Sequence, residues 1–391
     1  MSCYQKSKIQ EPNSNDNEGY GVYVNIVNDT MLVSAAGRGK GDELEPFGKG
    51  AVYAYRKIAG NWVLEQIIEN NDVNFGFGFS LSLGQNRALI SAPRENNGKG
   101  KVYVYEYSNG QWQKTHTIVP PYATVSNPDA FGGFVLLKGD TAFISEQYSS
   151  NTNYRSGRVY VYKLVNNSWV LAQELKADPA GGYTYFGSFI AEKDGRLFVG
   201  SYDGLQLNPL WVLDEINGQW VHTSKIIPAD GELGDSFSRR IYPVSANRII
   251  VSTVKDKASN GKETGSFSIF DYDSNSSSWQ LFAKVFPPGA NPESKTYFVS
   301  GLAVVGEDLF VSTPYADEVA INSGTIYHYR LNKNSIQYRG LIKMNQPLSR
   351  SRFGTSLLVE NNNIWVNTYK DKGTGSVIRF ENDIIFTSSF E

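Results

Sequence analysis

The chain has 391 residues, of which 40% are hydrophobic, 13% aromatic and only 19% charged. This composition is typical of a folded β protein, and it excludes a disordered chain or a coiled coil. The 37 Lys and Arg residues nearly balance the 39 Asp and Glu residues, which gives a formal net charge of -2. Such a chain has no global field for attracting nucleic acid or an anionic membrane, so we expect no nucleic-acid partner.

The counts of cysteine and histidine exclude further classes of site. The single cysteine, Cys3, rules out a disulfide framework, and His116, His222 and His328 are too scattered for a common zinc site. No apolar run approaches the roughly 18 to 20 residues that span a bilayer, and no apolar segment precedes the polar start. We therefore expect no cofactor, no bound metal, no membrane-spanning segment and no signal peptide in this chain.

The first 19 residues form a polar stretch that we interpret as a flexible N-terminal tail. Cys3, followed by this Asn-rich stretch, resembles the lipid-modified first residue of a mature bacterial lipoprotein. A lipid anchor at Cys3 is therefore one hypothesis, and an unmodified cysteine is the other.

A repeat of 51 to 61 residues runs through the rest of the chain. Each unit opens with an aromatic residue, in most units followed by Gly, and the seven units start near Tyr20, Phe77, Phe131, Phe186, Phe237, Phe298 and Phe353. An apolar segment and a tight turn follow, then a second strand such as ALISAP at 88–93 and a long polar stretch. A third strand such as GKVYVYEY at 100–107 ends in a hairpin turn, and a fourth strand completes the unit.

The third strand predicts how the units pack. In VYVY at 102–105, the Val residues point to one face of the sheet and the Tyr residues to the other, so both faces need covering. Five tryptophans open the fourth strand, and we expect them to lie in the core between units: Trp62, Trp112, Trp169, Trp220 and Trp279. Ile336 and Ile384 take this place in the last two units.

Repeated four-stranded units that cover one another are the blades of a β-propeller. We predict an all-β fold with residues 20–391 forming a single seven-bladed β-propeller, four antiparallel strands per blade. The last unit holds a fourth strand in IIFTSSF at 384–390, so the tail need not join it. If the tail does pair there, the strand register shifts by one and the two faces keep their loops.

Three motifs carry a family resemblance. F-G-x-S-L at 77–81 and 353–357, ALISAP at 88–93 and G-x-V-Y-V-Y at 100–105 resemble FG-GAP repeats, the blades of the integrin α-chain propeller. The resemblance covers the chain from about residue 20 to its end, and it implies a binding or adhesion module that is extracellular or at the cell surface. Its motifs are specific for the fold and not for the function.

The chain departs from metal-binding FG-GAP repeats at the turn between the first two strands. Calcium needs six to eight oxygen ligands, and the short turns GQNR, KGDT, SANR and GEDL offer at most one or two carboxylates. We predict no calcium there. A weak cation site near Asp140 or Asp308 is the alternative.

The long connections, from the second strand to the third and from the fourth to the next unit, all emerge on one side of such a disc, here called the long-loop face. Binding residues concentrate on long loops over a rigid scaffold, and Tyr and Arg are enriched at binding hot spots. The candidate ligand-binding residues are Arg94, Tyr148, Arg155, Tyr185, Tyr202, Arg239, Arg240, Tyr315, Arg352 and Tyr369. The arginines come from several units and could converge near the central opening, which predicts an anionic ligand such as an acidic glycan or a carboxylate-bearing peptide.

The sequence holds no nucleophile elbow, metalloprotease motif or nucleotide-binding loop. We therefore expect a monomeric, non-catalytic binding module for a protein or glycan, with no catalytic residue. One alternative is lectin-like carbohydrate recognition, and another is a polysaccharide lyase or glycosidase that uses loop carboxylates and Tyr on the same face. A carboxylate pair about 5 to 9 Å apart in a deep cleft would favour the enzyme.

Overall fold

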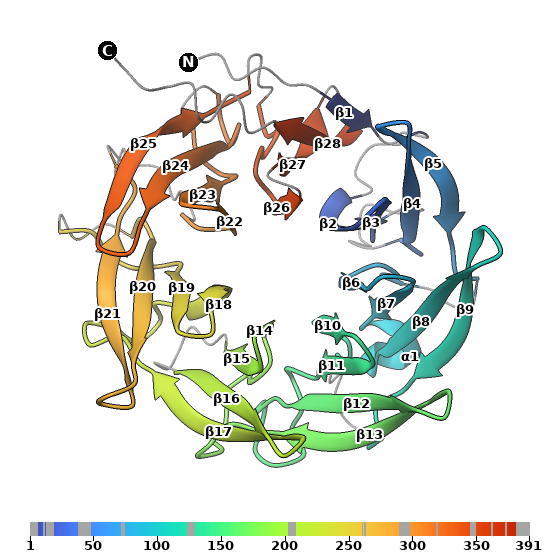
Figure 1. Cartoon of the computed structure of the whole chain (residues 1–391), viewed down its shortest axis with the longest axis horizontal. Coiled ribbons are helices and arrows are strands. Elements are labelled where there is room, and N and C mark those ends of the chain that lie inside the picture. The colour runs from blue at the N-terminus through green and yellow to red at the C-terminus, as the bar shows by residue number, and fades with distance from the viewer. Residues whose placement is uncertain are drawn as a thin grey trace.

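The computed structural model describes residues 7–10, 12, 19–37, 48–71, 75–122, 130–201, 209–259, 261, 263–288, 298–317, 320–344, 349–360, 363–371 and 374–380, with the backbone alone for 369–371 and 374. These residues form seven sheets of four antiparallel strands each, arranged as blades in a ring (Figure 1). The prediction of an all-β, seven-bladed propeller is confirmed.

The strands follow the chain from blade 1 to blade 7. Blade 1 contains β2 (Tyr20–Val27), β3 (Thr30–Ala35), β4 (Ala51–Ile58) and β5 (Asn61–Ile68), and blade 2 contains β6 (Leu81–Leu83), β7 (Arg87–Ala92), β8 (Lys101–Ser108) and β9 (Gln111–Ile118). Blade 3 contains β10 (Val135–Lys138), β11 (Thr141–Ser145), β12 (Val159–Val165) and β13 (Ser168–Leu175), and blade 4 contains β14 (Phe189–Lys193), β15 (Arg196–Gly200), β16 (Leu210–Ile216) and β17 (Gln219–Ile226). Blade 5 contains β18 (Phe237–Ser245), β19 (Arg248–Thr253), β20 (Ser266–Asp273) and β21 (Ser278–Val285), and blade 6 contains β22 (Gly301–Val305), β23 (Asp308–Thr313), β24 (Thr325–Leu331) and β25 (Ile336–Ile342). Blade 7 contains β26 (Leu357–Glu360), β27 (Asn363–Asp371), β28 (Thr374–Phe380) and β1 (Ser7–Gln10), and one short helical turn, α1 (Glu95–Gly98), lies between β7 and β8.

The first strand of each unit lies nearest the centre of the ring. The strands β2, β6, β10, β14, β18, β22 and β26 surround the central opening, and each contacts the equivalent strand of the next blade (Figure 1). The strands that open with tryptophan lie at the rim. Because consecutive strands are antiparallel, the short turns emerge on one side of the disc, the short-turn face, and the long connections emerge on the other.

The N-terminal segment closes the ring, which corrects the prediction that residues 1–19 form a tail outside the sheets. Ser7–Gln10 pairs antiparallel with β28, from Ser7 opposite Arg379 to Gln10 opposite Ser376. Ile9 packs, partly buried, against the core between blades 7 and 1. An exposed edge of β28 would leave backbone groups unpaired, and β1 covers that edge. The fourth strand expected at 384–390 and the anchor expected at Cys3 lie outside the described residues.

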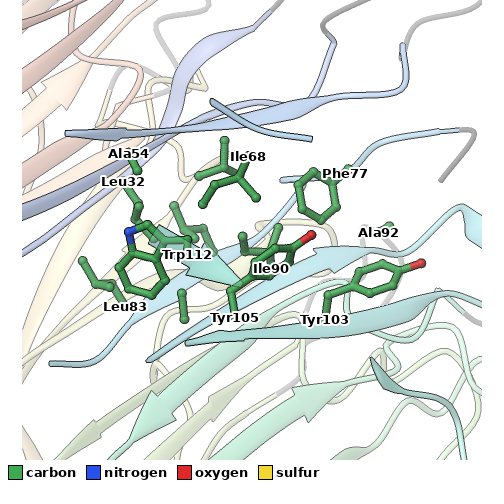
Figure 2. Close-up of a cluster of buried hydrophobic side chains, with 13 residues drawn as sticks. Leu32, Ala54, Ile68, Phe77, Leu83, Ile90, Ala92, Tyr103, Tyr105 and Trp112 are labelled. Atoms are coloured by element: carbon green, nitrogen blue, oxygen red, sulfur yellow. The ribbon is translucent and has the colours of Figure 1, made fainter. Parts of the chain in front are cut away.

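The core consists of layers between blades. Tyr103 and Tyr105 of β8 pack in the layer toward blade 1, together with Leu32 and Phe77 (Figure 2). On the other face of the same strand, Val102 and Val104 pack in the layer toward blade 3. The alternation of Val and Tyr therefore serves two cores, as the sequence predicts.

The Phe-Gly motif connects one blade to the next. Phe131, which opens the third unit, is fully buried, and its N–H donates to the Lys99 carbonyl at 3.1 Å. The next residue along blade 2, Gly100, has φ +82, and a Cβ there would lie 2.0 Å from the Phe131 oxygen. Glycine is needed because the two backbones approach so closely. Gly50 faces Phe77 in the same way, with a Cβ-to-oxygen distance of 2.1 Å.

The tryptophans lie between blades, as predicted. Trp112 and Trp220 are 3% and 5% exposed. The ring of Trp220 packs edge-to-face on Phe143 of blade 3 at 5.4 Å, and its backbone N–H donates at 2.8 Å to Gln173 on the rim of that blade. Trp220 therefore stabilises the packing of its blade against the preceding one. A tryptophan at the equivalent position does the same wherever its ring contacts a described ring of the preceding blade.

Among the residues that the structure describes, none forms a helix with the length and hydrophobicity that a membrane crossing requires.

Candidate functional site

The long-loop face carries the predicted binding residues in two separate groups. Tyr148, Arg155 and Tyr185 belong to the first group, on blades 3 and 4. Arg239, Arg240 and Tyr315 belong to the second, on blades 5 and 6, where Arg352 of blade 7 joins them. Arg94 lies exposed before α1 and takes part in neither group. Tyr202 and the side chain of Tyr369 lie outside the described part of the chain.

The first group is a cluster of four tyrosines around Arg155, here called the tyrosine cluster: Tyr148, Tyr154, Tyr183 and Tyr185. The Arg155 guanidinium lies over the rings of Tyr148 and Tyr154, at 5.8 and 5.3 Å from their centroids, and its Nη1 donates to the Tyr185 hydroxyl at 3.3 Å. Tyr148 packs edge-to-face on Tyr185 at 5.7 Å, and Tyr154 on Tyr183 at 5.2 Å. These contacts hold the five side chains in one arrangement.

The tyrosine cluster is exposed although its rings are packed. Tyr148, Tyr154 and Tyr183 are 38%, 48% and 40% exposed. No carboxylate among the described residues pairs with Arg155, and the hydrogen bond to Tyr185 raises the pKa of the guanidinium. The cluster therefore presents aromatic surface, hydroxyl groups and one positive charge to solvent.

The backbone of two connections positions the cluster. One connection links β11 to β12 and the other links β13 to β14. Tyr183 N–H donates to the Tyr154 carbonyl at 2.8 Å, and Tyr185 N–H donates to the Arg155 carbonyl at 3.1 Å. Arg155, Tyr183 and Tyr185 all have positive φ, between +50 and +57. Because side chains at positive φ are uncommon, we interpret these loops as held in a set conformation.

The second group lines a cavity of about 470 Å³ between blades 5 and 6, here called the basic cavity. Arg239, Arg240, Lys255 and Tyr315 face it from β18, the end of β19 and the end of β23. The guanidinium of Arg352 lies 5.1 Å from the centroid of the Tyr315 ring. No Asp, Glu or His is among the described residues that line this cavity.

The residues predicted from the sequence make up only part of both groups. Lys255, Tyr154 and Tyr183 are not among them, because the importance of the two tyrosines depends on two connections meeting in space and Lys255 has no distinguishing pattern. One signal in the sequence does mark the cavity. The Gly of the Phe-Gly motif is replaced by Ser238 in the fifth unit and by Val299 in the sixth, and these are the two units that form the cavity.

The carboxylates and histidines named in the sequence analysis have protein partners. Asp140 Oδ1 accepts from Arg87 at 2.8 Å, and Asp308 Oδ1 accepts from His328 at 2.7 Å if that ring nitrogen carries the proton. Within the described residues no three His, Cys, Asp or Glu side chains gather as a metal site would require. His116 and His222 lie 2.9 and 2.8 Å from the backbone carbonyls of Asn167 and Lys176. Each of these four side chains therefore has a hydrogen-bond partner within the protein.

A larger hollow of about 730 Å³ lies on the short-turn face between blades 5 and 6. Its arginine, Arg248, binds both oxygens of Asp271 at 2.6 and 2.7 Å and also donates to the Asn332 carbonyl at 3.0 Å. The positive charge is therefore neutralised by the protein. The basic cavity differs because its lining residues include no such acid.

No protein-family model matches the chain, and no curated protein matches it. Solved structures do share the fold. The periplasmic gluconolactonase PpgL of Pseudomonas aeruginosa is 14% identical with a TM-score of 0.54, over 82% of this chain and 84% of that one. Sqt1 of Saccharomyces cerevisiae is 11% identical with a TM-score of 0.56, over 98% and 86%. A Lactobacillus plantarum protein is 13% identical with a TM-score of 0.56, over 88% and 92%. Neighbours this distant define a class by fold alone, that of propeller proteins, and none of the three is described as an integrin or an FG-GAP protein.

Proposed function

We propose that this protein is a non-catalytic binding module whose tyrosine cluster contacts a protein or glycan ligand. The observation that carries the proposal is the exposed cluster itself, in which Tyr148 and Tyr154 contact Arg155 and Tyr183 packs on Tyr154 at the long-loop face. Exposed aromatic side chains are costly to leave in water and are enriched at binding hot spots, as is Arg. A cluster that is already packed loses little entropy when a ligand binds.

The alternative of a polysaccharide-acting enzyme needs two carboxylates about 5 to 9 Å apart across a cleft. The described lining of the basic cavity has no carboxylate, and the tyrosine cluster has none either. These two facts support binding over catalysis. The fold shared with a gluconolactonase does not alter this preference, because distant propellers share architecture without sharing sites.

We further propose that the units are of the FG-GAP type and that the protein acts as a monomer outside the cell or at its surface. The contact between Phe131 and Gly100, repeated between Phe77 and Gly50, accounts for two of the three motifs on which the FG-GAP resemblance rests, F-G-x-S-L and G-x-V-Y-V-Y. Carbohydrate recognition of the lectin type and protein adhesion both suit an exposed patch of Tyr and Arg. A lipid anchor at Cys3 is a separate hypothesis, which mass spectrometry of the protein from its native source would test.

The experiment is a broad glycan array at physiological salt, with and without a chelator, using the wild-type chain and Arg155→Ala. Arg94→Ala is the matched control, because Arg94 is another exposed arginine on the long-loop face outside the cluster. Selective binding that survives the chelator and disappears only in Arg155→Ala supports a metal-independent lectin. Binding lost with the chelator overturns the prediction of no calcium, and binding unaffected by Arg155→Ala overturns the assignment of the cluster.

A blank array favours a protein ligand and leads to cross-linking capture from the native source. Capture supports the proposal only if Arg155→Ala abolishes it and Arg94→Ala does not. Turnover of a polysaccharide by the wild-type chain would contradict the non-catalytic assignment.

A further inference from the structure

The basic cavity is separate from the tyrosine cluster and does not enter the proposed function. It has a volume of about 470 Å³, and the described residues that line it include Arg239, Arg240 and Lys255. A cavity of this size holds a ligand of about one or two sugar residues. These three side chains are cationic and no described lining residue is a carboxylate, so the described lining is positively charged although the whole chain has a net charge of -2.

Arg240 has an unusual environment for a guanidinium. Its Nε donates to the Ser300 carbonyl at 2.9 Å and its Nη1 to the Arg239 carbonyl at 3.1 Å, while its Cζ lies 5.6 Å from the Phe189 ring centroid. Nη2 takes part in neither hydrogen bond. No carboxylate among the described residues pairs with this side chain, and the hydrogen-bond partners that the structure describes are neutral carbonyls.

The position of Arg240 in the repeat explains why its side chain is partly buried. It is the fourth residue of the motif that begins at Phe237, and the equivalent residues include Phe134, Phe189 and Tyr23. Two of these side chains pack on each other across neighbouring blades, with the ring centroids of Phe134 and Phe189 4.7 Å apart. Burial raises the pKa of Tyr23 and lowers the pKa of Arg240, and the two groups interact electrostatically although they come from blades 1 and 5. A guanidinium remains charged in proteins, so a partly buried one with no carboxylate among its described neighbours is suited to binding an anion.

The backbone beside the cavity is strained. At the second motif position five units have glycine at positive φ, as in Gly78 and Gly132, whereas Ser238 and Val299 hold φ values of +66 and +72. A β-branched residue at positive φ is rare, and such strain concentrates at binding sites. Val299 lines the cavity and Ser238 precedes Arg239 directly. The two exceptions to the glycine rule therefore coincide with the cavity.

We propose that the basic cavity binds an oxyanion, a carboxylate or a phosphate monoester, carried by a ligand of monosaccharide size. Arg240 binds the oxyanion through its free Nη2 edge. Arg239 and Lys255 add positive charge at the mouth of the cavity, and Tyr315 contacts the sugar ring. Guanidinium groups suit this role because their planar donors match the geometry of both oxyanions.

The test is calorimetric titration of the full chain at low salt with glucuronate, glucose 6-phosphate and glucose as probes. We expect at least one acidic probe to bind with a Kd below about 1 mM and glucose not to bind at that level. The tighter of the two acidic probes identifies carboxylate or phosphate as the anion. Addition of about 0.5 M NaCl weakens the interaction if it is electrostatic.

Two variants assign the binding to the cavity. Arg240→Gln is expected to weaken the binding of the acidic probe by at least about tenfold, and Arg94→Gln, at an exposed arginine outside both groups, is expected to leave it unchanged. If Arg240→Gln unfolds, Lys255→Gln replaces it, because Lys255 is exposed; the expected loss is about threefold.

The proposal is overturned if neither acidic probe binds, if glucose binds equally well, or if the folded cavity variant binds like the wild type. The proposal is also overturned if Arg155→Gln abolishes binding and Arg240→Gln retains it. That result would show that the anion binds at the tyrosine cluster. A failure of the glycan-array experiment leaves this test unaffected, because the two sites share no residue.

Discussion

Arginines on the two faces of the disc are held in different ways. On the short-turn face, Arg196 binds both oxygens of Asp214 at 2.6 and 3.0 Å and donates to the Ala246 carbonyl of the next blade at 2.9 Å. On the long-loop face, Arg155 contacts tyrosines and Arg240 contacts backbone carbonyls. A charge that the protein neutralises stabilises the ring, whereas a charge left without a counterion is suited to a ligand.

The difference between neutralised and unneutralised arginines also depends on whether the arginine occupies a repeated position. Arg87, Arg196 and Arg248 occupy the same position, the first residue of the second strand, and each pairs with an acid at the end of the third strand. In the part of the chain that the structure describes, the tyrosine cluster and the basic cavity each occur once. Contacts that every unit needs are structural, and departures from the repeat are where we assign binding. Arg158 is an exception, since it lies buried near the long-loop face and is paired with Glu174.

The largest effect is expected where two backbones meet. Gly100→Ala should destabilise the fold by more than about 3 kcal/mol, because its Cβ would lie 2.0 Å from the Phe131 oxygen and its φ is +82. Gly110→Ala is the control, with φ +79 and no atom within 4 Å of its Cβ, and should cost about 1 kcal/mol. Chemical denaturation measures both. Equal losses would show that φ, and not the contact between blades, requires the glycine.

The comparison of arginines is tested directly by two matched substitutions. Arg196→Ala should lower the free energy of unfolding by about 2 kcal/mol, because it leaves Asp214 without its partner and removes a link to blade 5. Arg155→Ala should change it by less than about 0.5 kcal/mol and should affect binding instead. A loss of stability in Arg155→Ala as large as that in Arg196→Ala would remove the distinction between the two faces.

The contact between β1 and β28 that closes the ring occurs once and is nevertheless structural. It is therefore an exception to the rule that departures from the repeat are assigned to binding. A chain that lacks residues 1–10 loses β1 and exposes the edge of β28, and we expect a stability loss of about 1.5 kcal/mol with increased aggregation. A chain that lacks residues 1–6 keeps Ser7–Gln10 and is the control. Denaturation and light scattering measure the two effects, and unchanged behaviour of the shorter chain would show that β1 is dispensable.

The smallest effect is expected within the tyrosine cluster. Tyr185→Phe removes the hydroxyl that accepts from Arg155 Nη1 at 3.3 Å and retains the ring that packs on Tyr148. Affinity for the ligand found on the array should fall two- to threefold, by about 0.5 kcal/mol, with no measurable change in stability. An affinity loss as great as that of Arg155→Ala would show that the hydroxyl itself, and not the position of the arginine, determines binding.

Much of the fold could be predicted because the motifs recur. Alternation in Val102–Tyr105 predicts a strand buried on both faces, and the turns and tryptophans predict four strands per unit. The closing strand was missed because Ser7–Gln10 has four residues and one large apolar side chain, too short a pattern to distinguish from a polar tail.

The sequence predicted on which face of the disc the candidate residues lie, but not which of them share a site. Topology assigns Tyr148 and Arg240 to the long-loop face, because each lies at a long connection or at the strand end beside one. Whether they share a site depends on which connections meet, and the sequence contains no measure of that distance. The structure separates them into two groups and adds Lys255 to one.

The sequence by itself determined the blades. The Phe, Gly, Tyr and Trp residues that make the contacts between neighbouring blades recur along the chain, and this recurrence can be recognised in the sequence. Only the tertiary structure decided which terminus closes the ring, which arginines are neutralised and which loops bring four tyrosines together. The physical reason is that blade contacts link equivalent positions in consecutive units. Ring closure and the two binding groups depend on where irregular loops and a chain terminus lie in space, and apart from the missing motif glycines at Ser238 and Val299 no local pattern encodes that.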